Sequence, residues 1–405
     1  MINNQLELIS FFGFLFFIYF IFGLLIGFNF NLLPPPIHNV PQDAFMDWIN
    51  VNIWANSSVK YSEWQSIYPP LTFAIANFLS NTECFSFQGI SEELLQCARD
   101  SKNFFLGFFL LSMFLTYKFI SKKINSKFSI KVGIIFFFYF SIPSIYLFER
   151  GNYLIIAYCL FLILLLKLNN RIYSILIKSI LINLKPYFIL FSSFYLFKRS
   201  FIEFFLVMLL SGLIFGISDL IVNDKNSLLF IKNSISFSFI NQTLPFQGIN
   251  YQMNFDLIFN ALEIKFNLEY IRDLYLSIKI FSFLIFLYFL TKYDYSNYDF
   301  MFLSILLLMI ISYSFGGYLC IFLLPFIIIY IKDKVILYML ILLMIPFDFN
   351  IYSKELGVYG STVFSGGTFV NHSLNVSFFA GIRPLLVQIL FFYFIYTRAL
   401  SIARK

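Results

Sequence analysis

Long apolar runs constrain this chain more than any other feature of its sequence. A helix needs about 20 mostly apolar residues to cross the hydrocarbon core of a bilayer, and somewhat fewer when it is packed among other helices. The runs therefore predict an all-α polytopic membrane protein with about ten transmembrane helices. They lie near residues 8–29, 103–120, 131–148, 152–168, 201–222, 273–291, 300–315, 317–331, 335–347 and 381–397.

The composition agrees with a protein whose main solvent is lipid. Of the 405 residues, 60% are hydrophobic and only 12% are charged, and the mean hydropathy is +0.81. Soluble proteins carry about 25% charged residues. The net charge of +7 does not indicate a nucleic-acid partner, because the Lys and Arg residues form short clusters between the apolar runs. Such clusters are typical of cytoplasmic loops in membrane proteins.

The basic clusters also predict the topology. Placing all of them inside requires an even number of crossings and leaves both termini cytoplasmic, in a single integral domain over residues 1–405. We expect this domain in the plasma membrane of a bacterium. Three long polar segments then lie outside the cell, near residues 30–102, 223–272 and 348–380.

One apolar segment, residues 172–197, does not fit a single crossing, because basic residues stand at both of its ends. Lys185-Pro186 lies in its middle, and a proline removes a helical hydrogen bond and clashes with the preceding turn. The segment therefore predicts a broken helical hairpin that starts and ends on the cytoplasmic side. Broken helices at membrane depth occur where protein or a watery cavity covers the freed backbone.

The first outer segment carries two carboxylates, Asp43 and Asp47, four residues apart and close to Trp48 and Trp54. If this piece is helical, the two carboxylates share one face. A carboxylate at the membrane interface suits a general base. The alternative is that the aspartates are solvated loop charges and the tryptophans are interfacial anchors.

Two cations are further candidates for a site. Arg150, followed by Gly151 and Asn152, lies at an outer turn, against the positive-inside tendency, where it could bind a phosphate or pair with Glu149. Lys185 is a candidate because a charge at membrane depth is costly. Its alternative is snorkelling of the ammonium to the interface.

The remaining motifs are weaker. Tyr68, Pro69 and Pro70 precede a short apolar stretch and predict an interfacial helix, because proline suits the first helical position. Asn241 and Gln242, in the second outer segment, could bind sugar hydroxyls or simply form a turn. Cys84 and Cys97 share an outer loop where a disulfide could persist. No ligand cluster supports a metal ion, and the sequence indicates no cofactor.

Together these strings resemble the GT-C-fold glycosyltransferases, and most closely glycosyltransferase family 87, the polyprenol-phosphate-mannose-dependent mannosyltransferases. The matches follow the family's order and cover roughly residues 40–330. The third string lacks the Gln of the family's Arg-Gly-Gln-Asn turn, and the tail at 371–384 departs from the family pattern. The strings are Asp47-Trp48, Ile67-Tyr68-Pro69-Pro70-Leu71, Arg150-Gly151-Asn152, Leu184-Lys185-Pro186 and Asn241-Gln242-Thr243-Leu244.

The resemblance implies an inverting membrane enzyme. It would transfer a hexose, with mannose expected, from a polyprenyl-phosphate-sugar donor to a lipid-linked or cell-surface glycan acceptor outside the cell. Asp47 would be the general base, with Asp43 as the second candidate. Arg150 and Lys185 would hold the donor phosphate. Tyr68, Pro69 and Pro70 would shape the pocket, and Asn152, Asn241 and Gln242 would lie at the substrates.

Two other functions stay open at the level of sequence. An O-antigen-type polysaccharide polymerase also has about ten helices, but that class relies on arginine-rich outer loops, and this chain has few outer arginines. A lipid-linked-sugar transporter or flippase would favour paired broken helices in two halves. Only one break, at Lys185-Pro186, is evident.

Overall fold

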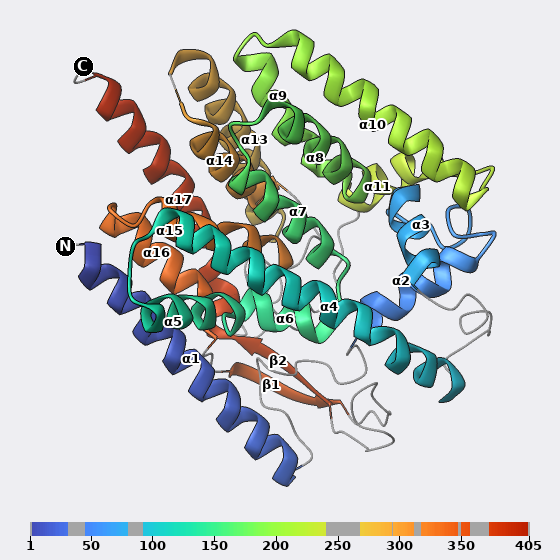
Figure 1. Cartoon of the computed structure of the whole chain (residues 1–405), viewed down its shortest axis with the longest axis horizontal. Coiled ribbons are helices and arrows are strands. Elements are labelled where there is room, and N and C mark those ends of the chain that lie inside the picture. The colour runs from blue at the N-terminus through green and yellow to red at the C-terminus, as the bar shows by residue number, and fades with distance from the viewer. Residues whose placement is uncertain are drawn as a thin grey trace.

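The computed structural model describes residues 2–30, 45–79, 92–239, 268–293, 295–311, 317–346, 350–356 and 372–403. These residues form a helical bundle with one short β-ribbon (Figure 1). The elements are α1 (Ile2–Phe30), α2 (Met46–Asn56), α3 (Pro70–Leu79), α4 (Glu92–Lys123), α5 (Phe128–Tyr139), α6 (Ile142–Arg150), α7 (Leu154–Leu166), α8 (Arg171–Leu184), η3 (Pro186–Phe188), α9 (Ile189–Phe197), α10 (Phe201–Val222), α11 (Leu229–Phe239), α13 (Leu268–Lys292), α14 (Asn297–Ile311), η4 (Gly317–Leu323), α15 (Leu324–Ile329), α16 (Lys334–Met344), β1 (Asn350–Leu356), β2 (His372–Ser377) and α17 (Phe378–Ala403).

The predicted helical, membrane-type chain agrees with the structure in outline. Each apolar run of the sequence coincides with one or more of these helices. Within the described residues, four segments are long and apolar enough to cross a membrane, and α5 with α6, bent by 57°, could form a fifth. Other apolar helices have only 10–17 residues, so the full count of ten spans stays a prediction. The four segments are Ile2–Gly23, Ser101–Lys123, Phe201–Val222 and Ile382–Leu400.

The helical path is interrupted between α8 and α9. α8 ends at Leu184, and Lys185 adopts an extended backbone conformation with φ −148° and ψ 115°. Pro186 explains this conformation, because a proline disfavours a helical residue before it. The short 3₁₀ helix η3 follows, and α9 then continues from Ile189. The side chain of Lys185 therefore projects from a helix break.

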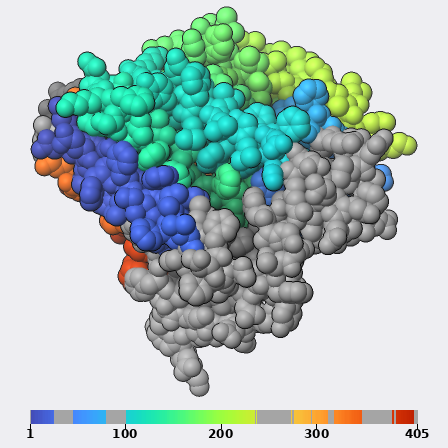
Figure 2. Space-filling view, turned by 60° about the horizontal axis from the view of Figure 1, so that its bottom comes forward, coloured from blue at the N-terminus to red at the C-terminus, as the bar shows by residue number. Residues whose placement is uncertain are grey.

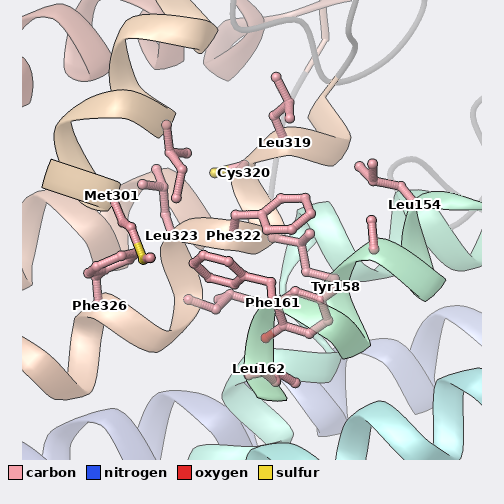
Figure 3. Packing of buried hydrophobic residues seen from close by; sticks show 14 of the residues in the cluster. Leu154, Tyr158, Phe161, Leu162, Met301, Leu319, Cys320, Phe322, Leu323 and Phe326 are labelled. Atoms are coloured by element: carbon pink, nitrogen blue, oxygen red, sulfur yellow. The ribbon is translucent and has the colours of Figure 1, made fainter. Parts of the chain in front are cut away.

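One part of the buried core of the bundle lies between α7 and the η4–α15 segment (Figure 3). Phe161 of α7 packs edge-on against Phe322 of η4, with ring centroids 5.1 Å apart. Tyr158, one turn earlier, also meets Phe322 edge-on. Cys159 and Cys320 are buried and unbridged in the same region. This packing fixes η4 against the start of α7, where the polar residues lie.

Small residues bring α1 and α5 into close contact along one edge of the molecule (Figure 2). A Cβ atom at Gly13 would collide with the backbone carbonyl of Gly133, and a Cβ at Gly133 would collide with the Ser10 side chain. Such small residues let helices approach closely where lipid offers little hydrophobic drive for association. Phenylalanine rings fill the rest of the interface, including the stacked pair Phe17 and Phe136.

Basic residues gather at one end of the bundle, which we call the basic end. They lie at the end of α4, directly after α7 and α9 and near the end of α17: Lys122, Lys123, Lys167, Lys198 and Arg398. Lys122 donates a hydrogen bond to the carbonyl of Leu166, which joins the ends of α4 and α7. Lys123 donates to the Tyr298 hydroxyl of α14. Arg398 of α17 forms an ion pair of 3.1 Å with Asp299. By the positive-inside tendency, this end is the one we expect in the cytoplasm.

The β-ribbon lies before α17. β1 and β2 pair antiparallel, from Leu356 opposite His372 to Asn350 opposite Ser377, with a register shift between Asn350 and Tyr352. The ribbon and α17 are continuous, because α17 begins at the residue after β2.

The close contact of α1 with α5 gives a testable consequence. Gly133→Ala should lower the free energy of unfolding by about 1–3 kcal/mol, because the new methyl group overpacks a full interface. Thermal unfolding of the purified protein in detergent measures the change. Gly107→Ala is the control, since nothing lies within 4 Å of its Cβ position. It should be neutral or stabilising, by up to about 1 kcal/mol, through helix propensity. Equal effects of the two substitutions would contradict the close-packing interpretation.

Candidate functional site

A carboxylate surrounded by hydrogen-bond donors lies at the centre of the candidate site. Asp47 stands in the first turn of α2, where the helix dipole favours a negative charge. Its Oδ1 accepts a hydrogen bond of 3.0 Å from Arg150 Nη2. Its Oδ2 accepts from Asn152 Nδ2 at 2.6 Å and from the Tyr318 hydroxyl at 2.8 Å. Three segments that are distant in sequence therefore meet at one side chain.

The turn between α6 and α7 presents both Arg150 and Asn152. Gly151 ends α6 in the left-handed conformation, with φ 61°, which glycine adopts without strain. A Cβ at this position would lie 2.7 Å from the Phe45 ring, so a glycine is required for this contact as well. The Asn152 side chain is fixed at its other end too, because Oδ1 accepts from the backbone N–H of Leu154. Its amide nitrogen therefore points at Asp47.

α2 is anchored on the same turn by aromatic contacts. Trp48 stacks on Tyr153, with ring centroids 4.4 Å apart and planes 13° from parallel. The Trp48 indole nitrogen donates to the Ser101 hydroxyl of α4 at 2.8 Å. The Tyr153 hydroxyl donates to Asn52, one turn further along α2. These buried contacts hold Asp47 in place relative to Arg150 and Asn152.

Lys185 reaches the same site from the break between α8 and α9. Its ammonium lies over the Tyr68 ring, 3.7 Å from the centroid, and within electrostatic range of Asp47. Thr72, near the start of α3, donates to the carbonyl of Leu184 and so ties α3 to the break. Burial raises the pKa of the Tyr68 phenol, and the Asp47 carboxylate raises it further while Arg150 opposes this. Tyr68 is therefore neutral at physiological pH.

Tyr318 is a site residue that the sequence reasoning missed. It stands at the start of η4, and its ring stacks on Tyr146 of α6, with centroids 4.7 Å apart and planes 10° from parallel. The only sequence signal is its place at the start of the run 317–331, next to the expected outer turn that follows the run 300–315. No local motif relates it to Asp47, 271 residues earlier.

The site and the basic end lie at opposite ends of α7. This helix starts beside Asn152 and ends at Leu166, whose carbonyl accepts from Lys122. Its 13 residues span about 20 Å at 1.5 Å per residue. A hydrocarbon core is about 30 Å thick, so the distance from the site to the basic end along α7 is shorter than the thickness of that core. α4 continues beyond Ser101, its contact with Trp48, as far as Glu92.

The loop between α2 and α3 is clamped from the α10–α11 side. Lys60 and Asp224 form a buried ion pair of 3.0 Å, with 4% of each side chain exposed. Asn233 of α11 donates to the backbone carbonyls of Tyr61 and Ser66. The clamp holds the loop that leads to Tyr68.

Most of the predicted site residues that the structure describes do come together. Asp47, Arg150, Asn152, Lys185 and Tyr68 form one cluster. Pro69 and Pro70 are buried where α3 begins. Three other predicted residues, and the Cys84–Cys97 pair, cannot be placed, because Asp43, Asn241, Gln242, Cys84 and the side chain of Cys97 lie outside the described residues.

Within the described ranges, no three His, Cys, Asp or Glu side chains gather as a metal site would require. Family models, curated proteins and solved structures give no match to this chain. The functional proposal therefore depends on the geometry of the site and on the resemblance of its sequence strings.

The buried clamp can be tested by removing one of its charges. Lys60→Met should lower the free energy of unfolding by about 3–5 kcal/mol, because it leaves the Asp224 carboxylate buried without its partner. The double variant Lys60→Met/Asp224→Asn removes both charges and keeps an acceptor for the backbone N–H of Asn226. It should recover most of the loss in a thermal unfolding measurement. A double variant as unstable as Lys60→Met would show that the ion pair is not the source of the effect.

Proposed function

We propose that this protein is a membrane glycosyltransferase of the GT-C type. It takes a hexose, expected to be mannose, from a polyprenyl-phosphate-sugar donor. It transfers this hexose to a hydroxyl of a lipid-linked or cell-surface glycan outside the cell. Asp47 acts as the general base, and Arg150 and Lys185 receive the donor phosphate.

The observation that carries the proposal is the grouping of one carboxylate with two cations at the end of the bundle opposite the basic end. A structural ion pair needs only one cation for Asp47. The second, Lys185, is brought to the same carboxylate from the break between α8 and α9, and an anionic group there would interact favourably with its ammonium. Arginine suits a phosphate through its planar fork, and lysine acts as a point charge. The donor phosphate supplies an anion of this kind.

The reaction follows from these positions. The acceptor hydroxyl loses its proton to the Asp47 carboxylate, and its oxygen forms a bond to the anomeric carbon of the sugar. The bond between that carbon and the phosphate oxygen breaks, and its electron pair leaves with the polyprenyl phosphate. Negative charge grows on the leaving phosphate, where Arg150 and Lys185 stabilise it. Attack from the face opposite the leaving group inverts the anomeric configuration.

Asn152 and the aromatic residues complete the site. Asn152 holds Asp47 through a bond to the ionised carboxylate, a type about twice as strong as a neutral hydrogen bond. Tyr68 offers its ring to Lys185, a cation–π contact that keeps the ammonium beside the carboxylate. Pro69 and Pro70 fix the backbone at the start of α3 next to Tyr68.

Replacement of the base tests the proposal directly. Asp47→Asn keeps the shape of the side chain and removes its proton-accepting charge. Transfer of radiolabelled mannose from polyprenyl phosphate to a glycolipid acceptor should fall about 10²–10⁴-fold, the usual contribution of a general base. Full activity in Asp47→Asn would exclude Asp47 as the base. Absence of transfer by the wild type from any polyprenyl-phosphate sugar, with transfer from a nucleotide sugar instead, would exclude the proposed donor class.

A matched pair of lysines tests the phosphate contact. Lys185→Gln should raise the KM for the donor about tenfold, a loss of about 1.4 kcal/mol of binding energy. Lys198→Gln is the control, because Lys198 also lies over a tyrosine ring, at 4.3 Å from Tyr295, but at the basic end of the same helical hairpin. Its kinetics should stay at the wild-type level. Equal effects at both positions would argue against a specific role for Lys185.

A further inference from the structure

We propose that Tyr318 is a positioning residue that gives the two oxygens of Asp47 different roles. In this arrangement Oδ2 anchors the side chain and Oδ1 receives the proton of the acceptor hydroxyl. The inference rests on the proposed glycosyl transfer and adds to it an atom-level assignment and a residue from the distant η4 segment.

The hydrogen bonds of the carboxylate distinguish its two oxygens. Each oxygen of an ionised carboxylate can accept about two hydrogen bonds. Oδ2 already accepts from Asn152 and Tyr318, so both of its positions are filled. Oδ1 accepts only from Arg150 among the described residues. Among the residues that the structure describes, Oδ1 therefore has one acceptor position left for a hydroxyl, and 16% of the Asp47 side chain is exposed.

The Tyr318 hydroxyl is held rigidly enough to set this arrangement. Its ring stacks nearly parallel on Tyr146, and the residues that follow it, Leu319 to Leu323, are fully buried in the core. Asn152 approaches Oδ2 from the turn between α6 and α7 and Tyr318 approaches it from η4, so the carboxylate cannot turn about its terminal bond without losing one of them. A fixed carboxylate keeps Oδ1 directed at the substrates.

Arg150 links the binding of the donor to the availability of Oδ1 as the base. It is the partner of Oδ1 and also the residue that we assign to the donor phosphate. When the phosphate attracts Arg150, Oδ1 loses its strongest partner, while Tyr318 and Asn152 still hold Oδ2. The base then becomes available at the moment at which the donor is bound. Without Tyr318, the carboxylate would follow Arg150 toward the phosphate.

The test removes one hydroxyl and preserves the ring stack. Tyr318→Phe should lower kcat by about 10–100-fold, because a small displacement of a catalytic group costs up to about 10² in rate. Its KM for the polyprenyl-phosphate-mannose donor should stay within about twofold of the wild type. Tyr139→Phe is the matched control. It also loses a buried hydroxyl, one that bonds to Ser112 and Thr116 and is remote from Asp47.

The outcomes separate the two proposals. A loss of kcat in Tyr318→Phe alone, with thermal unfolding like that of Tyr139→Phe, supports the positioning role. Equal losses of kcat in both variants, or a raised KM with unchanged kcat in Tyr318→Phe, overturn it, as does wild-type kinetics in Tyr318→Phe. In these cases the proposed function still holds, provided that the wild type transfers the sugar. If the wild type transfers no sugar, the glycosyl-transfer proposal and this inference are both overturned.

Discussion

The contact between Asp47 and the turn after α6 is the constraint on which the rest of the site depends. A partly buried carboxylate is costly unless charged and polar partners compensate it. Arg150 and Asn152 supply this compensation only because Gly151 reverses the chain between them in a left-handed conformation. The next residues of the two segments are also in contact, because Trp48 stacks on Tyr153. Together these contacts orient α2 relative to α6 and α7.

Much of this arrangement could be predicted from local patterns. The apolar runs predict the helices, because a membrane-spanning helix needs one continuous apolar stretch of sequence. Pro186 gives the helix break from which Lys185 projects, since its ring disfavours a helical conformation at the residue before it. The motif strings named Asp47, Tyr68, Arg150, Asn152 and Lys185, all of which lie in one cluster.

The parts that could not be predicted are long-range pairs. Tyr318 donates to a carboxylate 271 residues away, and Lys60 pairs with Asp224 across 164 residues. Nothing near these positions in sequence marks the partner, because only the packing of α7 against η4, or of α3 against α10, brings the partners together. The number of membrane crossings could not be predicted either. Several apolar helices are too short to identify as spans by length and composition alone.

The wide separation of the three segments around Asp47 also affects how the protein is made. A ribosome adds about 5–20 residues per second, so the Tyr318 partner of Asp47 emerges on the order of tens of seconds after the carboxylate. Asp47 at first has none of these partners. Arg150 and Asn152 are synthesised next, and Tyr318 of η4 follows last. A chain that stops before residue 318 therefore lacks one of the two anchors of Oδ2. The site is assembled last, after most of the helices have been delivered to the membrane.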